Sequence, residues 1–469
     1  MRAVRYVGET GCSDATYTAA LAEAPNGVID TLPGGNVTLR FLRDGHPLLV
    51  NMAQLSRDLV DVAVMAYITD EMEPRSSAPD RWTRSHHFQV PVRDPALWSR
   101  ATPVLAKALN RVAGDNFSFT WFERSAVPVK KHRIRLTRGY DAVCLFSGGI
   151  DSLLGAYHLL QGGKKLILLG HQADNITAAA QTVLAGQLAL LFPGKTTLVQ
   201  CRVARSQSEQ MRFQLAEKCE DTHRCRSFLF LSLAGAIAST ASVNEIYIPE
   251  NGLIALNAPL QRSRMGTLST RTAHPLFLCD FGNLLSQLGI FTGAIRNPFI
   301  YQSKTDMLRG LPADMVPLVK RSVSCSRPSR YQNLHVRHCG YCVPCIYRRA
   351  AMIEAGWDKG IDEYAFDAFL HLQDLKDYQK VDFRALVRFA ERHATAPEID
   401  LEMTVLAHGY FSPDVGARLG PAATTDYSPW TNMLRSWSQD FLRKMRSACS
   451  PETLGIVGLN PAVIEVPTP

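Results

Sequence analysis

The stretch Asp141-Ala-Val-Cys-Leu-Phe-Ser-Gly-Gly-Ile-Asp-Ser152 decides the fold predicted for this chain. Its apolar first half is typical of a buried parallel strand. Ser147-Gly148-Gly149 then predicts a turn, and residues 151–160 have the apolar spacing of a helix. A strand, a glycine turn and a helix start leave several backbone N–H groups unpaired at the positive end of the helix dipole. The segment therefore predicts an anion site suited to phosphate.

The side chains of this turn agree with a phosphate site. Gly148 and Gly149 let the backbone approach an anion closely, and the hydroxyls of Ser147 and Ser152 can donate further hydrogen bonds. The alternative is an ordinary strand-to-helix turn in which Asp151 and Ser152 only start the helix. No Gly-x4-Gly-Lys-Ser/Thr sequence occurs, which excludes the usual nucleotide P-loop.

Length and composition indicate a soluble globular protein of two to four domains. The chain has 469 residues, of which 46% are hydrophobic and 20% charged. It has no run of about 18 apolar residues and no signal-peptide core, so we expect a cytoplasmic protein without a membrane partner. The net charge of +8 is modest and scattered, which favours an anionic ligand weakly and nucleic acid less. Eleven cysteines, an odd number, favour thiols and metal ligation over disulfides.

Residues 1–138 are predicted to form a separate N-terminal α+β module without a catalytic constellation. The expected strands are residues 36–42 and 88–92, and the expected helices are residues 52–67 and 98–109. The basic run at residues 130–138 has the alternation of a strand with one solvated face.

Residues 139–324 alternate strand and helix, which is typical of a parallel sheet with helices on both faces. Further strands are expected at residues 165–170, 197–203 and 245–249, and a long buried helix at residues 225–239. Ligands of such sheets bind outside the carboxyl ends of the strands. Residues that follow the strands, such as His171, Gln172, Glu250 and Asn251, are therefore expected to converge there with the first loop.

Two further segments are candidates for the same crevice. The basic, glycine-containing stretch at residues 262–275 suits a lid or an anionic-substrate loop, and an exposed connection is an equal alternative. Lys304 lies in the first turn of an expected helix, where a cation does not favour the helix dipole. This placement allows a phosphate-facing role, although the position alone favours a free surface lysine.

A cysteine cluster predicts a metal site in residues 325–356. Cys325, Cys339, Cys342 and Cys345 offer four soft ligands, and glycine and proline between them allow a tight loop. Four thiolates fill the coordination shell of Zn2+, so the site is expected to be structural. An iron–sulfur cluster is the main alternative, and His335 or His338 could replace one thiolate.

Residues 357–469 are predicted to form a helical C-terminal region. Apolar residues recur every three or four positions at 364–372, 383–390 and 431–445. This pattern favours docking on the neighbouring domain, with a partner-binding face as the alternative.

The loop sequence Ser-Gly-Gly-x-Asp-Ser resembles the pyrophosphate loop of the PP-loop ATP pyrophosphatases, which have a HUP-like fold. The loop, the helix that begins Arg226-Ser-Phe-Leu-Phe and the late cysteines occur in the order found in the 7-cyano-7-deazaguanine synthase (QueC) family, over residues 140–356. That resemblance implies adenylation of the carboxylate of 7-carboxy-7-deazaguanine by ATP, attack by ammonia, and zinc on the cysteines. The implied cofactors are ATP, Mg2+ and Zn2+.

The resemblance also assigns roles to residues. Ser147, Asp151, Ser152 and Lys304 are expected to be catalytic, and Asp151 is the expected contact of Mg2+. The nucleotide is expected to contact Ser147, Gly148, Gly149, Asp151, Ser152, His171 and Gln172. The deazapurine-type substrate is expected to contact Arg226, Ser227, Glu250, Asn251 and Arg271.

Two departures from the family pattern concern the substrate and the acceptor. The family's Asn/Asp segment that runs into Tyr-Pro-Asp-Cys-Arg is absent, and Glu250-Asn-Gly252 and residues 269–275 stand in its place. The extra N-terminal module, with Trp82-Thr-Arg84 and Val90-Pro-Val92, looks like the QueC-like proteins of bacterial anti-phage systems, the QatC type and its relatives in type IV CBASS operons. Those relatives imply an amine on a partner protein from the same operon as an alternative acceptor to ammonia.

Two other functions are compatible with the same sequence. A tRNA-modifying sulfurtransferase would need a reactive thiol near the loop, and neither Cys144 nor Cys279 has evident activation. A non-catalytic scaffold could bind a nucleotide and a partner protein, although the intact serines and aspartate of the loop argue against it.

Overall fold

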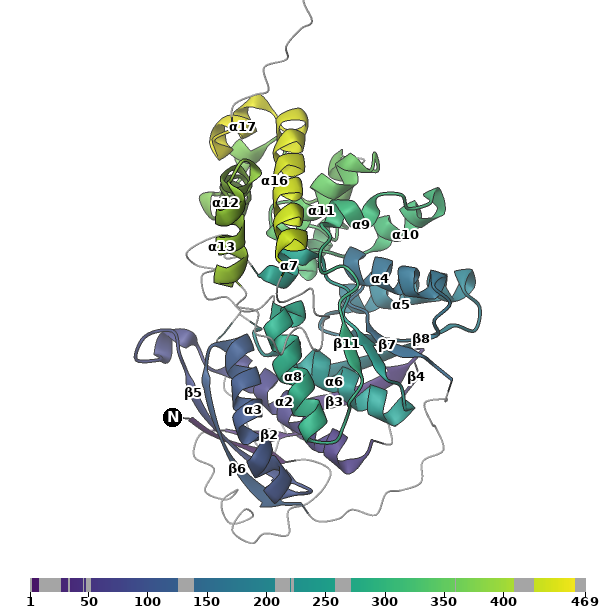
Figure 1. Ribbon diagram of the computed structural model, residues 1–469, viewed down its shortest axis with the longest axis vertical. Helices are drawn as coiled ribbons and strands as arrows, with labels where there is room; N and C mark the ends of the chain where they lie inside the picture. Colours follow the sequence, from purple (N-terminus) through teal and green to yellow (C-terminus); the bar gives the residue numbers. More distant parts are fainter. Residues whose placement is uncertain are drawn as a thin grey trace, which may run out of the picture.

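The computed structural model contains two β-sheets and a group of C-terminal helices (Figure 1). It describes residues 2–7, 27–32, 34–44, 46–47, 52–124, 139–206, 220, 223–257, 271–358, 360–408 and 426–459. Among these residues, no helix combines the length and the apolar character needed to cross a membrane.

The larger sheet confirms the predicted α/β fold. Its seven strands lie in the order β11-β10-β7-β8-β9-β3-β4, and the five from β11 to β9 are parallel. The chain leaves the central strand β7 toward β8 and β9 on one side and returns to β10 and β11 on the other. The topological switch therefore lies at β7. The parallel strands are β7 (Ala142–Leu145), β8 (Leu166–His171), β9 (Thr196–Arg205), β10 (Glu245–Tyr247) and β11 (Ala294–Arg296).

The side chains of these strands alternate between two hydrophobic layers, as expected for a sheet that is covered on both faces. Val143 and Ile167 face one layer with α6 and α8, whereas Cys144 and Leu168 face the other with α4 and α5. The helices around this sheet are α4 (Ile150–Gln161), α5 (Asn175–Leu191), α6 (Arg226–Ala241), α7 (Gly252–Leu256), α8 (Pro275–Gln287), α9 (Lys304–Leu308), α10 (Val316–Arg321) and α11 (Val343–Glu354).

The smaller sheet is parallel and has the order β2-β1-β5-β6. Its strands are β1 (Arg2–Val7), β2 (Val28–Asp30), β5 (Ser85–Val92) and β6 (Asn116–Glu123), and the N-terminal helices are α2 (Gln54–Met72) and α3 (Pro95–Ala113). Apart from one hairpin, the N-terminal strands in the described residues belong to this sheet.

That hairpin consists of β3 (Val37–Arg43) and β4 (His46–Pro47), and it extends the larger sheet. The strand predicted at residues 36–42 is confirmed, but it pairs antiparallel with β9, so that Phe41 lies opposite Cys201. The domain boundary at residue 138 stays a prediction, and β3 shows that N-terminal residues contribute directly to the second sheet.

The C-terminal region is helical, as predicted, except for one segment. Its helices are α12 (Asp377–Ala394), α13 (Glu398–His408), α16 (Ser428–Ala448) and α17 (Pro451–Val457), drawn in green and yellow in Figure 1. The helix predicted at residues 364–372 is wrong. There the Asp367 carboxylate accepts hydrogen bonds from the N–H groups of Phe369 and Leu370, at 3.1 and 3.0 Å, and holds the chain in a turn.

Short 3-10 helices connect several of these elements. They are η1 (Arg75–Ser77), η3 (Arg271–Ala273), η4 (Ala313–Met315), η5 (Pro328–Leu334), η6 (Gly360–Glu363) and η7 (Leu372–Asp374). The strand predicted at residues 130–138 and the loop segment 262–270 lie outside the described residues.

Candidate functional site

The predicted phosphate loop lies at the carboxyl edge of β7, directly before α4. Ser147 is exposed, and its Oγ lies 3.1 Å from Ser152 Oγ and accepts a 3.3 Å hydrogen bond from the N–H of Gly149. No side chain of the described residues caps the start of α4, which begins after Gly149. The helix therefore presents uncapped N–H groups beside two hydroxyls, a donor set that suits an anion.

Gly148 is held in a conformation that other residues adopt with strain. Its φ is +84°, and a Cβ there would lie 3.3 Å from atoms of Thr177, Ala180 and Gln181 in α5. Its carbonyl accepts a 2.8 Å hydrogen bond from the N–H of Val323. The loop is thus packed between α5 and the segment that precedes Cys325.

Asp151 of α4 lies at the centre of a cluster of buried polar side chains. Its Oδ2 accepts hydrogen bonds from Asn251 Nδ2 at 2.7 Å and from the Asn251 N–H at 3.3 Å. Its Oδ1 forms an ion pair with Lys304 Nζ from the first turn of α9. Asp151 and Lys304 are each 9% exposed, so Lys304 is not a free surface lysine. The structure brings three predicted site residues from three different elements together; their roles in catalysis stay predictions.

Glu250 lies beside this group, one residue before Asn251, and is only partly buried. Burial and, to a smaller extent, the nearby Asp151 carboxylate raise the pKa of its carboxyl group to about 7, whereas Lys304 and Arg226 act in the opposite direction. This carboxyl group therefore changes protonation state near neutral pH.

His171 is the last residue of β8 and is buried, at 7% exposure. Among the described residues, neither ring nitrogen has a hydrogen-bond partner of good geometry. The ring packs edge-on against Tyr67 of α2, with 5.7 Å between the centroids, and lies 5.3 Å from the ring of Phe230. Burial lowers the pKa of His171 to about 4, so the imidazole is neutral at physiological pH. Gln172 follows it, partly exposed, and its N–H donates to the carbonyl of Cys201 at 2.8 Å.

Helix α2 contacts the start of α6, where two of the predicted substrate residues lie. Asp70 of α2 accepts a 2.9 Å hydrogen bond from the N–H of Cys225, one residue before Arg226. Asp70 is itself held by an ion pair with Arg84. Ser227 is buried and its Oγ lies 2.6 Å from Thr272 Oγ1. The side chain of Arg271 lies outside the described part of the chain, so the structure does not place it.

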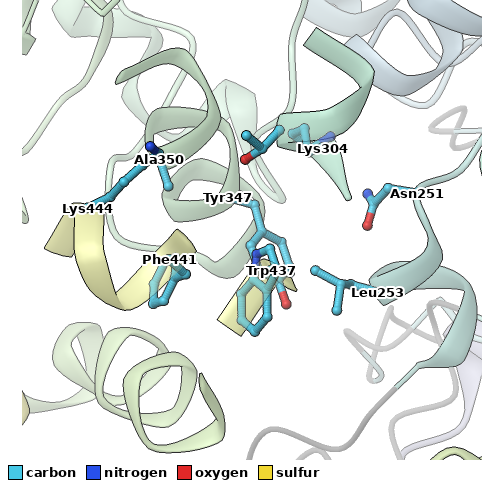
Figure 2. Close-up of a pocket in the computed structure, with 9 residues that line it drawn as sticks. Asn251, Leu253, Lys304, Tyr347, Ala350, Trp437, Phe441 and Lys444 are labelled. Carbon is cyan, nitrogen blue, oxygen red and sulfur yellow. The ribbon is translucent and has the colours of Figure 1, made fainter. Parts of the chain in front are cut away.

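A pocket lies next to Lys304 and Asn251, between α7, α9, α11 and α16 (Figure 2). Tyr347 of α11 and Trp437 of α16 supply its aromatic wall, with their rings 5.5 Å apart in an edge-to-face arrangement. The C-terminal region thus reaches the back of the Asp151 group. The lining residues are Asn251, Leu253, Lys304, Thr305, Tyr347, Ala350, Trp437, Phe441 and Lys444.

The four predicted metal ligands lie together. The sulfur atoms of Cys325, Cys339, Cys342 and Cys345 are all within 4.8 Å of one another, and Cys339 Sγ lies 3.8 Å from Cys345 Sγ. Tetrahedral Zn–S bonds of about 2.3 Å separate sulfurs by about 3.8 Å, so the group fits Zn2+. The ion would be held by these four thiolates and would clip the loop to α11.

Two neighbours of the cluster explain its shape. Gly340 has a φ of +89°, and a Cβ there would lie 2.0 Å from the carbonyl oxygen of Phe366, so only glycine fits. His338 does not join the four thiols, because its Nε2 accepts a 3.2 Å hydrogen bond from the N–H of Ser324. His335 is exposed. Among the described residues, the group with metal-ligand geometry therefore consists of cysteines alone.

The sequence did not single out several residues that the site depends on. Gln181 of α5 donates to the carbonyls of His171 at 3.1 Å and Ser147 at 3.4 Å. Asn297 and Tyr67 also contact predicted site residues. A buried glutamine in an Ala/Leu-rich helix was the one visible signal, since such a side chain needs partners.

The parallel sheet, the loop at its carboxyl edge and the cysteine cluster define an α/β protein of the PP-loop type. The chain is similar to the 7-cyano-7-deazaguanine synthase of Methanothrix thermoacetophila, with 27% identity over 231 residues that cover 46% of this chain and 95% of that protein. This similarity supports a distant relationship to the QueC family and an enzyme of the synthase kind. No protein-family model and no solved structure matches the chain.

Proposed function

We propose that this chain is an ATP-dependent synthetase of the PP-loop type that adenylates the carboxylate of a 7-deazaguanine acid, releases pyrophosphate and passes the acyl group to an amine. The acceptor is ammonia or an amine on a partner protein, and the setting is bacterial anti-phage defence in the cytoplasm. The observation that carries this proposal is the juxtaposition of Asp151, Lys304 and Asn251 beside the Ser147–Gly149 loop.

The geometry suits a reaction that splits ATP between its α and β phosphates. The uncapped start of α4 and the hydroxyls of Ser147 and Ser152 offer donors to the departing pyrophosphate. Lys304 supplies a positive charge at the same edge, and Asp151 would hold Mg2+ when the nucleotide is bound. Such donors stabilise charge that develops on the leaving group.

The sulfurtransferase alternative receives less support. It requires an activated thiol near the loop, whereas burial raises the pKa of the Cys144 and Cys201 thiols in the neighbouring strands. Both side chains are fully buried.

The direct test is an assay of purified protein with ATP, Mg2+ and 7-carboxy-7-deazaguanine. We expect AMP and pyrophosphate in equal amounts, and loss of both in Ser147→Ala while the zinc content is unchanged. A folded protein that forms neither product would exclude the proposal. Mass spectrometry of proteins co-expressed with this chain then distinguishes the acceptors, because a protein acceptor gains the mass of the deazaguanine acyl group.

A further inference from the structure

Glu250 is held at the reactive edge by its backbone, while its carboxylate is left without a partner among the described residues. The side chain of Asn297 forms hydrogen bonds with the peptide groups on both sides of Glu250. Its Oδ1 accepts from the Glu250 N–H at 3.3 Å, and its Nδ2 donates to the Glu250 carbonyl at 2.8 Å. The next residue, Asn251, is bonded to Asp151. The position of Glu250 is therefore fixed on both sides, and its side chain is partly exposed at the carboxyl end of β10.

The neighbouring carboxylate of Asp151, in contrast, has several partners. Asp151 is bound by Lys304 and Asn251, whereas no hydrogen bond or ion pair reaches the Glu250 carboxylate from any residue that the structure describes. The charged groups that act on Glu250 are Asp151 from α4, Lys304 from α9 and Arg226 from α6. No described residue uses the Glu250 carboxylate for a structural contact, so within the described part of the chain this carboxylate is available to a ligand.

We propose that Glu250 is the general base that deprotonates the acceptor amine in the second step of the proposed reaction. This inference rests on the proposed function, because it needs an acyl adenylate to be attacked. An amine is protonated at neutral pH and becomes a nucleophile only after it loses a proton, and a carboxylate beside the acyl carbon can remove it.

One proton passes from the ammonium group to the Glu250 carboxylate, and the nitrogen lone pair attacks the acyl carbon. The C–N bond forms, the bond from the acyl carbon to the AMP oxygen breaks, and AMP leaves with that electron pair. The second proton on nitrogen and the proton on Glu250 pass to solvent, which restores the carboxylate.

The raised pKa of Glu250 agrees with this role. A carboxyl group with a pKa of about 7 is a stronger base than an ordinary glutamate and is still half ionised at neutral pH. Because the base form is the ionised one, the rate of the acceptor step is expected to rise with pH while the Glu250 carboxyl group loses its proton, and then to level.

The experiment compares Glu250→Gln with Glu245→Gln in the full chain. Glu245 lies at the opposite end of the same strand, where it pairs with Lys164 and Arg296, and serves as the matched control. Pyrophosphate release is measured with ATP, Mg2+ and 7-carboxy-7-deazaguanine without amine. Product formation is then measured with ammonium and with hydroxylamine, which is already unprotonated at pH 7 and needs no base.

We expect Glu250→Gln to lose about 100-fold more in product formation with ammonium than in pyrophosphate release, and to recover product formation with hydroxylamine. This pH dependence should disappear in Glu250→Gln and persist in Glu245→Gln. A loss of pyrophosphate release in Glu250→Gln as large as the loss of product formation would overturn the inference, because it would place Glu250 in adenylation or Mg2+ binding. An unchanged rate with ammonium would overturn it too.

Two further outcomes keep the test decisive. If the native chain releases no pyrophosphate, the proposed function itself fails. If Glu250→Gln does not fold, Glu250→Asp retains a carboxylate at greater distance, and we expect a slower ammonium reaction that keeps its pH dependence. A Glu250→Asp protein with native rates for both amines would contradict the role of Glu250 as base.

Discussion

Lys304 and Asp151 form an ion pair between α9 and α4 across 153 residues of chain. Their side chains are only 11% and 12% exposed, so neither charge is well solvated. The pair also orients Asp151 toward Asn251, which donates two hydrogen bonds to its other oxygen. It joins the first and last parts of the parallel-sheet domain at the edge where ATP is proposed to bind.

Removing one partner should leave the other charge buried and uncompensated. We expect Lys304→Met to lower the free energy of unfolding by about 3 kcal/mol, measured by urea denaturation. The double variant with Asp151→Asn should cost less than the sum of the single changes, because no unpaired charge remains. The exposed Lys165→Met is the control, and equal losses in both lysine variants would refute the importance of the pair.

Replacing Gly148 should weaken ATP binding. Gly148→Ala places a methyl group against α5 at 3.3 Å and strains a residue with a φ of +84°. We expect the Kd for ATP, measured by calorimetry, to rise at least about tenfold, which equals about 1.4 kcal/mol. Gly163→Ala is a matched control, because Gly163 has a φ of +88° and open space around it. That variant should lose some stability and keep the native ATP affinity.

Loss of the metal should weaken ATP binding at the phosphate loop. Cys325→Ser should lower the zinc content well below one ion per chain, measured by elemental analysis, in a protein without the brown colour of iron–sulfur clusters. The segment that follows Val323 would then be less rigid. The hydrogen bond that the Val323 N–H donates to the Gly148 carbonyl would be weaker as a result. We expect ATP affinity to fall about fivefold, the equivalent of about 1 kcal/mol. Cys449→Ser, outside the cluster, should change neither quantity; native zinc content in Cys325→Ser would contradict the assignment.

Acid should destabilise the protein through His171. Its pKa in the folded state is about 4, below the usual value of 6.5, so the unfolded chain binds the extra proton between these values. The stabilisation is complete above pH 6.5 and is lost as pH falls to about 4, by about 3 kcal/mol. His171→Asn should lack this part of the pH dependence. Denaturation curves are measured for both proteins at pH 7 and pH 4.5. An equal fall in the free energy of unfolding between these two pH values would contradict the prediction.

Local patterns predicted much of the fold, because they reflect burial along one segment at a time. The apolar run before Ser147 became β7, and the spacing after Gly149 became α4. The cysteine spacing predicted the cysteine cluster, since three of its four members lie close together in sequence, from Cys339 to Cys345. These features need no knowledge of distant contacts.

The remaining features depend on contacts between distant segments. The strand predicted at residues 36–42 is confirmed as β3, but nothing local indicated that β3 would pair with β9. The apolar spacing at residues 364–372 suggested a helix, and the turn there follows from Asp367, whose carboxylate is also bound by Arg349 of α11. Likewise, Lys304 is buried, and not the free surface lysine that its sequence position also allowed, because Asp151 lies opposite it.

The β3–β4 hairpin has a practical consequence for anyone who trims this protein. A fragment that begins at residue 139 would retain every cysteine of the cluster and the whole Ser147 loop, yet it would leave the backbone of β9 bare along its outer side. The unpaired N–H and C=O groups of an exposed edge strand can pair with other chains, which leads to aggregation. The β3–β4 hairpin therefore covers the outer edge of the larger sheet, and its removal would expose β9 to other chains.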